Sequence, residues 1–242
     1  MTRSAPPQDF ISALGSLRDA WIDPSLIVHE VPAPTRLAAW SAAVEIETQE
    51  RNGEQPVAKA TLVILCDPQQ EEIWGGPIRL VGQARMSVDD DQSTDPLLGE
   101  VIWATLLQSL ADAGSTPVAC VGTVTREISQ TFGGLELQGS TLNADLRCSW
   151  TPTSNDLSAD LAGWAEALRS NSGVLPHGVA RIGNRWHCRP AAGHPTAELL
   201  PTCRRGQPSR PLLPRILHVH RGRTRQPDPA GHDRRRGGRR DR

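Results

Sequence analysis

Short segments of alternating or continuous apolar residues in the first part of the chain predict β-strands. Residues 43–50 alternate apolar and polar side chains, as a strand with one buried face does. Residues 60–66 form a continuous apolar run typical of a central strand, and residues 77–88 make a third strand. The Asn52-Gly53 dipeptide favours a turn between the first two. This order of strand, turn, strand, loop and strand predicts an antiparallel meander.

Two further strands are expected later in the chain. Residues 117–129 are rich in Val and Thr, and residues 141–150 alternate without a break. In the second of these strands one face carries only apolar side chains, which are Leu142, Ala144, Leu146, Cys148 and Trp150. One buried face and one solvated face are typical of an antiparallel sheet.

Apolar residues at three- and four-residue steps predict helices before, between and after these strands. The first helix covers residues 7–20. The second has Asp95 as its N-cap and Pro96 at its first position, and Gly114 suits its end. We therefore expect helices to alternate with groups of strands along the chain.

A third helix follows the polar residues 154–156 and ends at Gly173. Residues 22–34 are expected to be extended, because each residue before a proline is kept out of the helical region. The predicted fold class is α+β: a five-stranded antiparallel sheet with helices packed on it, in the order α-β-β-β-α-β-β-α.

Composition divides the chain after Trp186. Residues 187–242 contain 14 Arg and four acidic residues, which leaves 12 basic and 23 acidic residues in 1–186. The first part therefore has a balance of −11 and the second of +10. All seven Trp and both Phe lie in residues 1–186. We predict a single domain over 1–186 and a disordered Arg/Pro/Gly-rich tail over 187–242, because the tail has too few apolar residues to offset its backbone entropy.

Two interpretations of the tail remain open. Its arginine-glycine runs resemble segments that bind nucleic acid through phosphate charge, although no aromatic residue is interleaved for base stacking. The tail also lacks Lys, Asn, Phe, Tyr and Met, as an out-of-frame translation of GC-rich DNA does. Any nucleic-acid binding is expected through the tail alone, since the acidic body repels phosphate.

Two groups of residues have the side chains of a metal site without its spacing. The first group contains His187, Cys188, His194 and Cys203; the second contains Asp89, Asp90, Asp91 and Asp95. The first matches no zinc motif, and consecutive Asp side chains diverge instead of converging on one ion. Negative charge ahead of a helix N-terminus is the better account of the second group. We expect no metal site.

Neither catalysis nor a cofactor is indicated by any motif. His29 and His177 lie in extended connections, and no Ser or Cys stands in a nucleophile motif. No glycine-rich phosphate loop is present. There is no apolar run of membrane-spanning length and no signal peptide at residues 1–8, and the five cysteines are odd in number. These features favour a cytoplasmic protein with reduced thiols.

Several blocks of sequence follow one another in a recognisable order: residues 31–38 (VPAPTRLA), 95–98 (DPLL), 122–126 (GTVTR), 132–134 (FGG) and 149–152 (SWTP). Together they resemble an actinobacterial family catalogued as domain of unknown function number 3000. The resemblance covers roughly residues 8–186 and implies no activity, cofactor or catalytic residue. Separately, the predicted order of elements is similar to that of the type III secretion chaperone fold, in which a helix-backed sheet binds an extended partner segment.

Residues 122–134 are the best candidate for a partner surface. If Val118, Cys120 and Val124 face the core, then Thr123, Thr125 and Glu127 face outward. Arg126 interrupts the inward face, where its charge must be paired or reach water. Phe132-Gly133-Gly134 is expected to form a flexible tip with an exposed ring. The candidate patch consists of Thr123, Thr125, Arg126, Phe132, Gly133 and Gly134. The alternative is an ordinary hairpin whose Phe caps the core.

We predict a non-enzymatic protein-binding module, similar to a chaperone or an adaptor, with a protein partner or a second copy of itself. An enzyme without a recognisable motif is the first alternative, and nucleic-acid binding through the tail is the second. A cavity on the sheet face away from the helices, especially one reaching Arg126 or His29, would favour the enzyme.

Overall fold

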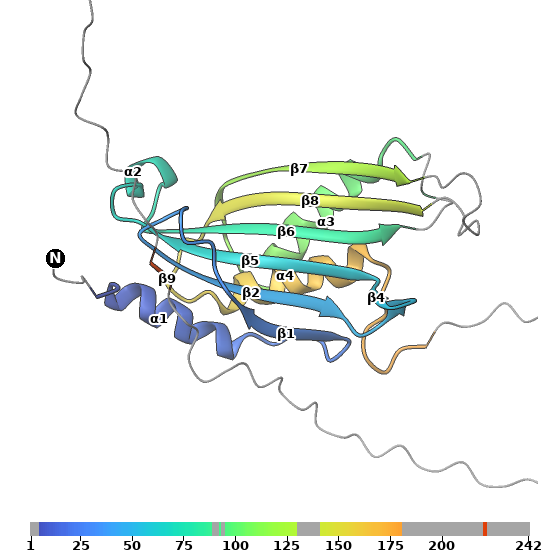
Figure 1. The fold of residues 1–242 in the computed structure, drawn as a ribbon, viewed down its shortest axis with the longest axis horizontal. Helices are drawn as coiled ribbons and strands as arrows, with labels where there is room; N and C mark the ends of the chain where they lie inside the picture. Colours follow the sequence, from blue (N-terminus) through green and yellow to red (C-terminus); the bar gives the residue numbers. More distant parts are fainter. Residues whose placement is uncertain (1–4, 89–91, 93–94, 130–140, 181–219, 222–242) are drawn as a thin grey trace, which may run out of the picture.

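The computed structural model describes residues 5–88, 92, 95–129, 141–180 and 220–221. One twisted antiparallel sheet runs through these residues, with the strands in the spatial order β1-β2-β5-β6-β8-β7 (Figure 1). Its strands are β1 (Leu26–Val31), β2 (Trp40–Thr48), β5 (Ala58–Cys66), β6 (Ile78–Val88), β7 (Val118–Ser129) and β8 (Thr141–Thr151). The predicted α+β class is confirmed.

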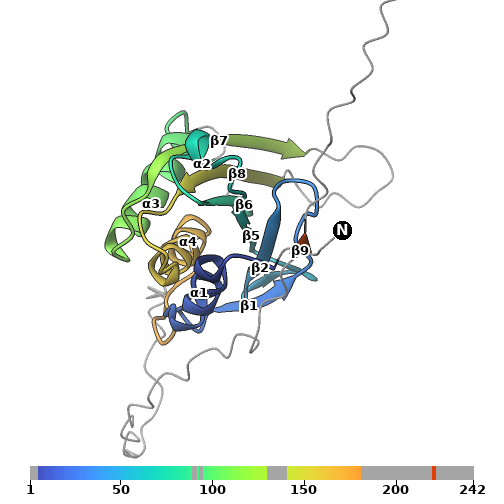
Figure 2. The same cartoon turned by 90° about the vertical axis from the view of Figure 1, so that its left-hand side faces the viewer.

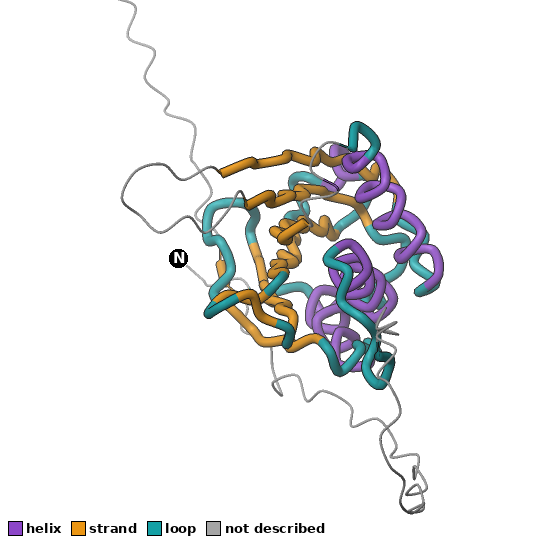
Figure 3. Tube along the Cα trace, turned by 90° about the vertical axis from the view of Figure 1, so that its right-hand side faces the viewer, coloured by secondary structure: helices purple, strands orange, loops and turns teal. Residues whose placement is uncertain are grey.

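Three helices cover one face of the sheet, as Figures 2 and 3 show from opposite sides. They are α1 (Gln8–Ser16), which continues as the 3-10 turn η1 (Leu17–Asp19), α3 (Leu98–Asp112) and α4 (Ser158–Asn171). Gly114 and Gly173 follow α3 and α4 in the left-handed conformation, with φ of 87° and 68°, so both predicted stops are confirmed. No described helix is both long and apolar enough to cross a membrane.

The start of α3 differs from the prediction. The helix begins at Leu98, two residues after the expected first position. Asp95 still acts as a local cap, because its Oδ1 accepts a hydrogen bond of 2.8 Å from the Leu97 N–H. Residues 95–97 thus form a turn that leads into the helix.

The sheet has one long strand more than predicted. Residues 26–31, expected only to be extended, pair along β2 as β1. Around Gly53, whose φ is 65°, the chain forms the small hairpin β3 (Arg51–Asn52) and β4 (Gln55–Pro56). A single helical turn, α2 (Glu71–Trp74), also escaped prediction.

Within the predicted tail, the structure describes only β9 (His220–Arg221), which pairs with the start of β2 at Trp40 and Ser41. The expectation of disorder over the rest of residues 187–242 lies outside the described residues, and so do the histidine and cysteine group of the tail and Asp89–Asp91.

The alternation that predicted β8 places its apolar side chains in the core. All five are 5% exposed or less. Trp150 of β8 packs against Trp164 of α4 with ring centroids 6.0 Å apart. The Trp164 ring reaches the backbone of β6 at Gly82, where an added Cβ would lie 2.8 Å from its Cη2. Glycine at this position therefore lets α4 sit directly on the sheet.

A smaller apolar cluster lies on the opposite face of the sheet. The connection between β1 and β2 folds over that face, and its Ala33 and Ala38 pack on Val63 and Leu65 of β5. Trp74 of α2 joins the same cluster. This face is thus covered near the end of β1 and the start of β2 and is mostly polar elsewhere.

Replacing Gly82 by Ala tests the close contact between α4 and the sheet. We expect Gly82→Ala to lower the free energy of unfolding by about 1–3 kcal/mol, because the new methyl overlaps Trp164 and the Sγ of Cys148. Urea unfolding followed by tryptophan fluorescence measures the change. Gly15→Ala is the matched control: it lies in α1 with no atom within 4 Å of the new Cβ, so it should leave stability unchanged or raise it. Equal effects of the two would contradict the packing described.

Candidate functional site

The part of the predicted patch that the structure describes lies on β7. Thr123, Thr125 and Arg126 are all exposed. Thr123 and Thr125 lie opposite Arg147 and Asp145 of β8, on the face away from the helices. The Arg126 guanidinium donates a 2.7 Å hydrogen bond to the backbone oxygen of Asp95, just before α3. Phe132, Gly133 and Gly134 lie outside the described residues.

A β-bulge explains one departure within this strand. The register of β7 against β8 shifts between Val118 and Val121, where Ala119 has a φ of 49°. Val118 pairs with Thr151 beyond the shift and is 43% exposed, so the strand does not continue its simple alternation there. An extra residue in one strand of a pair produces this change of face.

The polar part of the open sheet face holds a cavity of about 420 Å³. Its lining residues are Gln55, Pro56, Val57, Lys59, Thr61, Gln83, Arg85, Ser87 and Asn143. Neither Arg126 nor His29 is among them. Its two cations are already paired, Lys59 with Glu45 at 2.8 Å and Arg85 with Asp145 at 3.0 Å. The cavity therefore lacks the convergent groups that would favour an enzyme.

His29 is paired with a carboxylate, and two of the cysteines, Cys66 and Cys148, are buried. His29 Nε2 lies 2.9 Å from Glu45 Oε1. Burial would raise the pKa of Glu45, but the hydrogen bonds from Lys59 and His29 outweigh it and hold the pKa below 4.5. Burial raises the pKa of Cys66 to about 11 and that of Cys148 to about 12. Neither thiol is a thiolate near neutral pH, so neither is prepared as a nucleophile.

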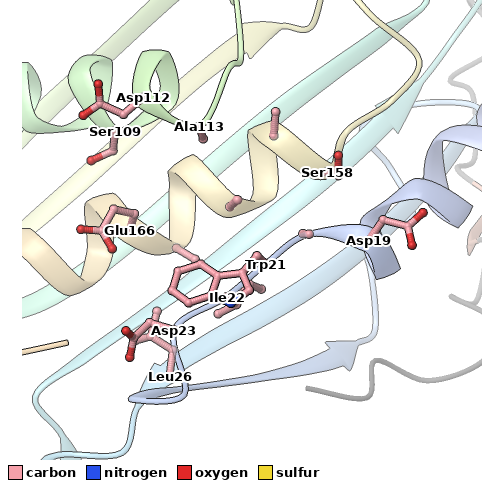
Figure 4. Close-up of a pocket in the computed structure, with 14 residues that line it drawn as sticks. Asp19, Trp21, Ile22, Asp23, Leu26, Ser109, Asp112, Ala113, Ser158 and Glu166 are labelled. Atoms are coloured by element: carbon pink, nitrogen blue, oxygen red, sulfur yellow. The ribbon is translucent and has the colours of Figure 1, made fainter. Parts of the chain in front are cut away.

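A groove of about 410 Å³ lies on the helical side, where three segments far apart in sequence meet (Figure 4). One wall is the stretch from η1 to β1, the other is the end of α3, and α4 forms the floor. The lining residues are Asp19, Ala20, Trp21, Ile22, Asp23, Leu26, Ser109, Asp112, Ala113, Ser158, Ala159, Ala162, Ala165 and Glu166. We call this the helical groove.

Local sequence explains the shape of the helical groove. The inward face of α4 carries the large side chains Leu161, Trp164 and Leu168, all 2% exposed or less. Its outward face carries Ala159 and Ala162 where a surface helix usually has long charged residues. Small side chains on the floor and bulkier walls make the surface concave.

Trp21 is the main apolar wall of the helical groove. Its neighbour Ile22 is 2% exposed and anchors the segment in the core, whereas Trp21 is 58% exposed. In Figure 4 the Trp21 ring lies beside α4, with Asp19 to one side and Asp23 to the other. An indole face held in the open beside carboxylates suits a cation, because the ring face carries negative partial charge.

The charges that line the helical groove are all negative. Its four ionisable residues are Asp19, Asp23, Asp112 and Glu166. Glu166 binds Arg169, whose Nε donates to Oε2 at 2.8 Å, and Arg169 does not line the groove. Asp112 accepts a 2.7 Å hydrogen bond from Gln108, a neutral group that leaves its charge uncompensated.

Asp23 is the carboxylate most firmly held in place. It is 8% exposed and accepts hydrogen bonds from the backbone N–H groups of Ser25 at 2.8 Å and His177 at 3.1 Å. Burial would raise its pKa, but these hydrogen bonds together with the charge of Arg169 hold the pKa below 3.8. Asp23 therefore stays charged near neutral pH and ties the end of the domain to the groove wall.

Sequence reasoning did not find the helical groove. Each wall is unremarkable in sequence, and only the fold brings residues 19–26, 109–113 and 158–166 together. One usable signal was present: the outward positions of α4 are alanine where solvated helices carry charge. Among the described residues, no group of three or more His, Cys, Asp or Glu side chains is arranged to hold a metal ion.

Comparison with known proteins places the chain in a family. A family model described as "Protein of unknown function (DUF3000)" matches residues 6–180. The chain belongs to this family. The DUF3000 region contains every long strand of the sheet and both walls and the floor of the helical groove. No curated protein and no solved structure matches the chain.

Replacing Asp23 by Asn tests the anchoring of the groove wall. We expect Asp23→Asn to lower the free energy of unfolding by roughly 1 kcal/mol at pH 7, because a neutral amide oxygen accepts the two N–H bonds more weakly. The folded pKa is lower than the unfolded value of 3.8, so this stabilisation is present above pH 3.8 and is lost as the pH falls through the folded pKa. Urea unfolding at a series of pH values measures the difference.

The control for Asp23→Asn is Asp19→Asn, which removes an exposed carboxylate of the same groove and should leave stability unchanged. If the difference between wild type and Asp23→Asn persisted in acid, the account of Asp23 would be wrong.

Proposed function

We propose that this protein is a cytoplasmic, non-enzymatic binding module that holds a cationic, partly apolar segment of a partner protein in the helical groove. The supporting observation is the lining itself. Four carboxylates and an exposed indole surround a floor of alanines, and no basic side chain lines the groove. Such a surface has charge to attract a cation and apolar area to hold the chain that carries it.

Charge sets the class of ligand. Opposite charges about 4 Å apart attract by about 4 kcal/mol at the dielectric typical of a protein surface, before desolvation is subtracted. The balance of −11 over residues 1–186 adds attraction at longer range, within a Debye length of about 8–10 Å at physiological salt. Anionic ligands such as nucleic acid are repelled by the same field.

The shape favours a peptide with spaced cationic side chains. Asp19 and Asp23 lie on the wall from η1 to β1, Asp112 lies on α3, and Glu166 lies on α4. An arginine or lysine can therefore meet a carboxylate on either side, with its alkyl stem on the alanine floor. A guanidinium stacked on Trp21 adds about 0.5–2 kcal/mol.

A chaperone- or adaptor-like role in an actinobacterial cell is the biological setting that we propose. Its support is the helix-backed antiparallel sheet, whose long elements follow in the order α-β-β-β-β-α-β-β-α and resemble the type III secretion chaperone fold with β1 added. The absence of any catalytic constellation among the described residues is the second support. In this setting the partner presents an extended basic segment.

Peptide binding tests this function. We expect a labelled peptide that alternates Arg with Leu to bind the full-length protein, measured by fluorescence anisotropy, and the same peptide with Glu in place of Arg not to bind. Trp21→Ala and Asp112→Asn should each weaken binding about three- to tenfold, in line with the loss of one cation–π contact or one exposed charge pair. Added salt should weaken it further.

Matched controls are Ile73→Ala and Glu72→Gln, which change an exposed apolar residue and an exposed carboxylate of α2 outside the groove. A peptide of residues 204–225 distinguishes the chain's own tail from a partner. Tighter binding of that peptide than of the Arg-Leu peptide would overturn the proposal of a separate partner. Equal binding of the Arg and Glu peptides would overturn the cationic groove.

A further inference from the structure

The outer edge of β7 is a second unpartnered surface, on a different part of the molecule from the helical groove. β7 has 12 residues and is the last strand of the sheet (Figure 1). It pairs with β8 on one side, and no described strand pairs with its other side. A strand in this position presents a row of backbone N–H and C=O groups that another strand can pair with.

The usual protection of an edge strand is sparse along β7. Proline and lysine are absent from it, and residues 121–125 carry no charge. Val121, the first residue of this stretch, and Ile128, three residues beyond it, are each 58% exposed. Only the bulge between Val118 and Val121 interrupts the edge. Long exposed edges with apolar side chains favour pairing with another chain.

We propose that a second copy of this chain pairs with it at β7, antiparallel and around a two-fold axis at Thr125. In such a pair, a residue a given number of positions before Thr125 lies opposite the residue the same number of positions after Thr125 in the second copy. Residues that lie opposite each other have their side chains on the same face of the sheet. Thr125 then faces its own copy. The remaining opposed pairs are Thr123 with Glu127, Val121 with Ser129, Val124 with Arg126, and Gly122 with Ile128. In no pair do like charges meet.

The unpaired side chain of Arg147 favours the register with the two-fold axis at Thr125. The Arg147 side chain is exposed, and its guanidinium makes no hydrogen bond or ion pair with a described residue. It lies on β8 opposite Thr123 of β7, on the face away from the helices. Glu127 of the second copy would stand on the next strand, opposite Thr123. Two strand spacings of about 4.8 Å separate the two backbones, a gap that an Arg and a Glu can span over the small threonine.

The pairing extends an ion pair already present in one chain. Glu127 Oε2 lies 2.7 Å from a guanidinium nitrogen of Arg85. In the dimer, Glu127 stands between Arg85 of its own chain and Arg147 of the second copy, and symmetry forms the arrangement twice. A two-fold axis at Val124 would oppose Glu127 to Val121 instead, and an axis at Arg126 would oppose two arginines. Charge complementarity therefore favours Thr125.

Charge alone does not drive the association. The acidic balance of residues 1–186 repels a second copy at long range. Backbone hydrogen bonds along β7 and burial of Val121 and Ile128 supply the attraction, and the Arg147–Glu127 pairs select the register. The dimer is independent of the helical groove, because no groove residue belongs to β7 or β8.

Charge reversal tests the proposal, with sedimentation velocity of the full-length protein as the measurement. The wild type should be a dimer that dissociates on dilution. Arg147→Glu and Glu127→Arg should each raise the dissociation constant at least tenfold, because each change occurs twice in the dimer. The double variant should bind more tightly than either single variant, since the opposite charges again face each other across Thr123. The recovery should be partial, because Glu127→Arg also removes the ion pair with Arg85.

The control is Arg51→Glu, which removes an exposed cation on β3 that pairs with Glu47 within its own chain. It should leave the dissociation constant unchanged. Circular dichroism of each variant shows that the fold is retained. A wild type that is monomeric at every concentration would overturn the proposal and leave the edge to a strand of another protein. A dimer insensitive to both charge reversals, or a double variant no better than the single ones, would also overturn it.

Discussion

A buried carboxylate holds the architecture together. Asp160, 3% exposed in the first turn of α4, accepts hydrogen bonds of 2.7 Å from the Trp150 Nε1–H of β8 and from the Ser115 hydroxyl that follows α3. Burial raises the pKa of Asp160 above 3.8, and the two donors oppose that rise. Three elements thus meet at one side chain, and an unmatched partner in such a site costs about 1–3 kcal/mol.

The hydrogen bonds of Asp160 hold α4 at the short distance from the sheet that Gly82 allows. In this position Trp164 points into the sheet and the alanine face of α4 points outward. The helical groove follows from that orientation. The large side chains of α4 are buried in the core, and the outward face of the helix carries small side chains. The wall that carries Trp21 and Asp23 lies beside this outward face. Fold stability and the proposed binding surface therefore depend on the same helix, while the β7 edge lies on separate elements.

The sequence predicted the fold where local pattern decides structure. The alternation of β8 and the glycines after α3 and α4 report directly on burial and on backbone conformation. β1 was missed because Pro24, Pro32 and Pro34 dominate the pattern around a short strand whose pairing is determined by β2. The bulge in β7 was missed because it depends on register against β8, which no local pattern carries.

The candidate functional surfaces were harder to predict from the sequence, because they too depend on contacts between distant segments. The helical groove joins residues 19–26 to residues 109–166, which lie more than 80 positions later in the sequence, and each lining residue is ordinary in its own segment. From the sequence alone, Arg147 is one of several residues on the solvated face of β8. Only the register of β8 against β7 shows that it lies opposite Thr123, next to the free edge of the sheet. The predicted patch contained the right strand, but its importance comes from the strand's position at the end of the sheet.

The central claim is that the helical groove binds a cationic segment, and a two-dimensional NMR titration of the full-length protein with the Arg-Leu peptide tests it most directly. The seven tryptophan indole N–H resonances serve as internal reporters. The account predicts that the Trp21 resonance shifts progressively to saturation, while that of Trp150, bonded to Asp160 in the core, stays in place. An unchanged Trp21 resonance at a peptide concentration that saturates binding elsewhere would contradict it.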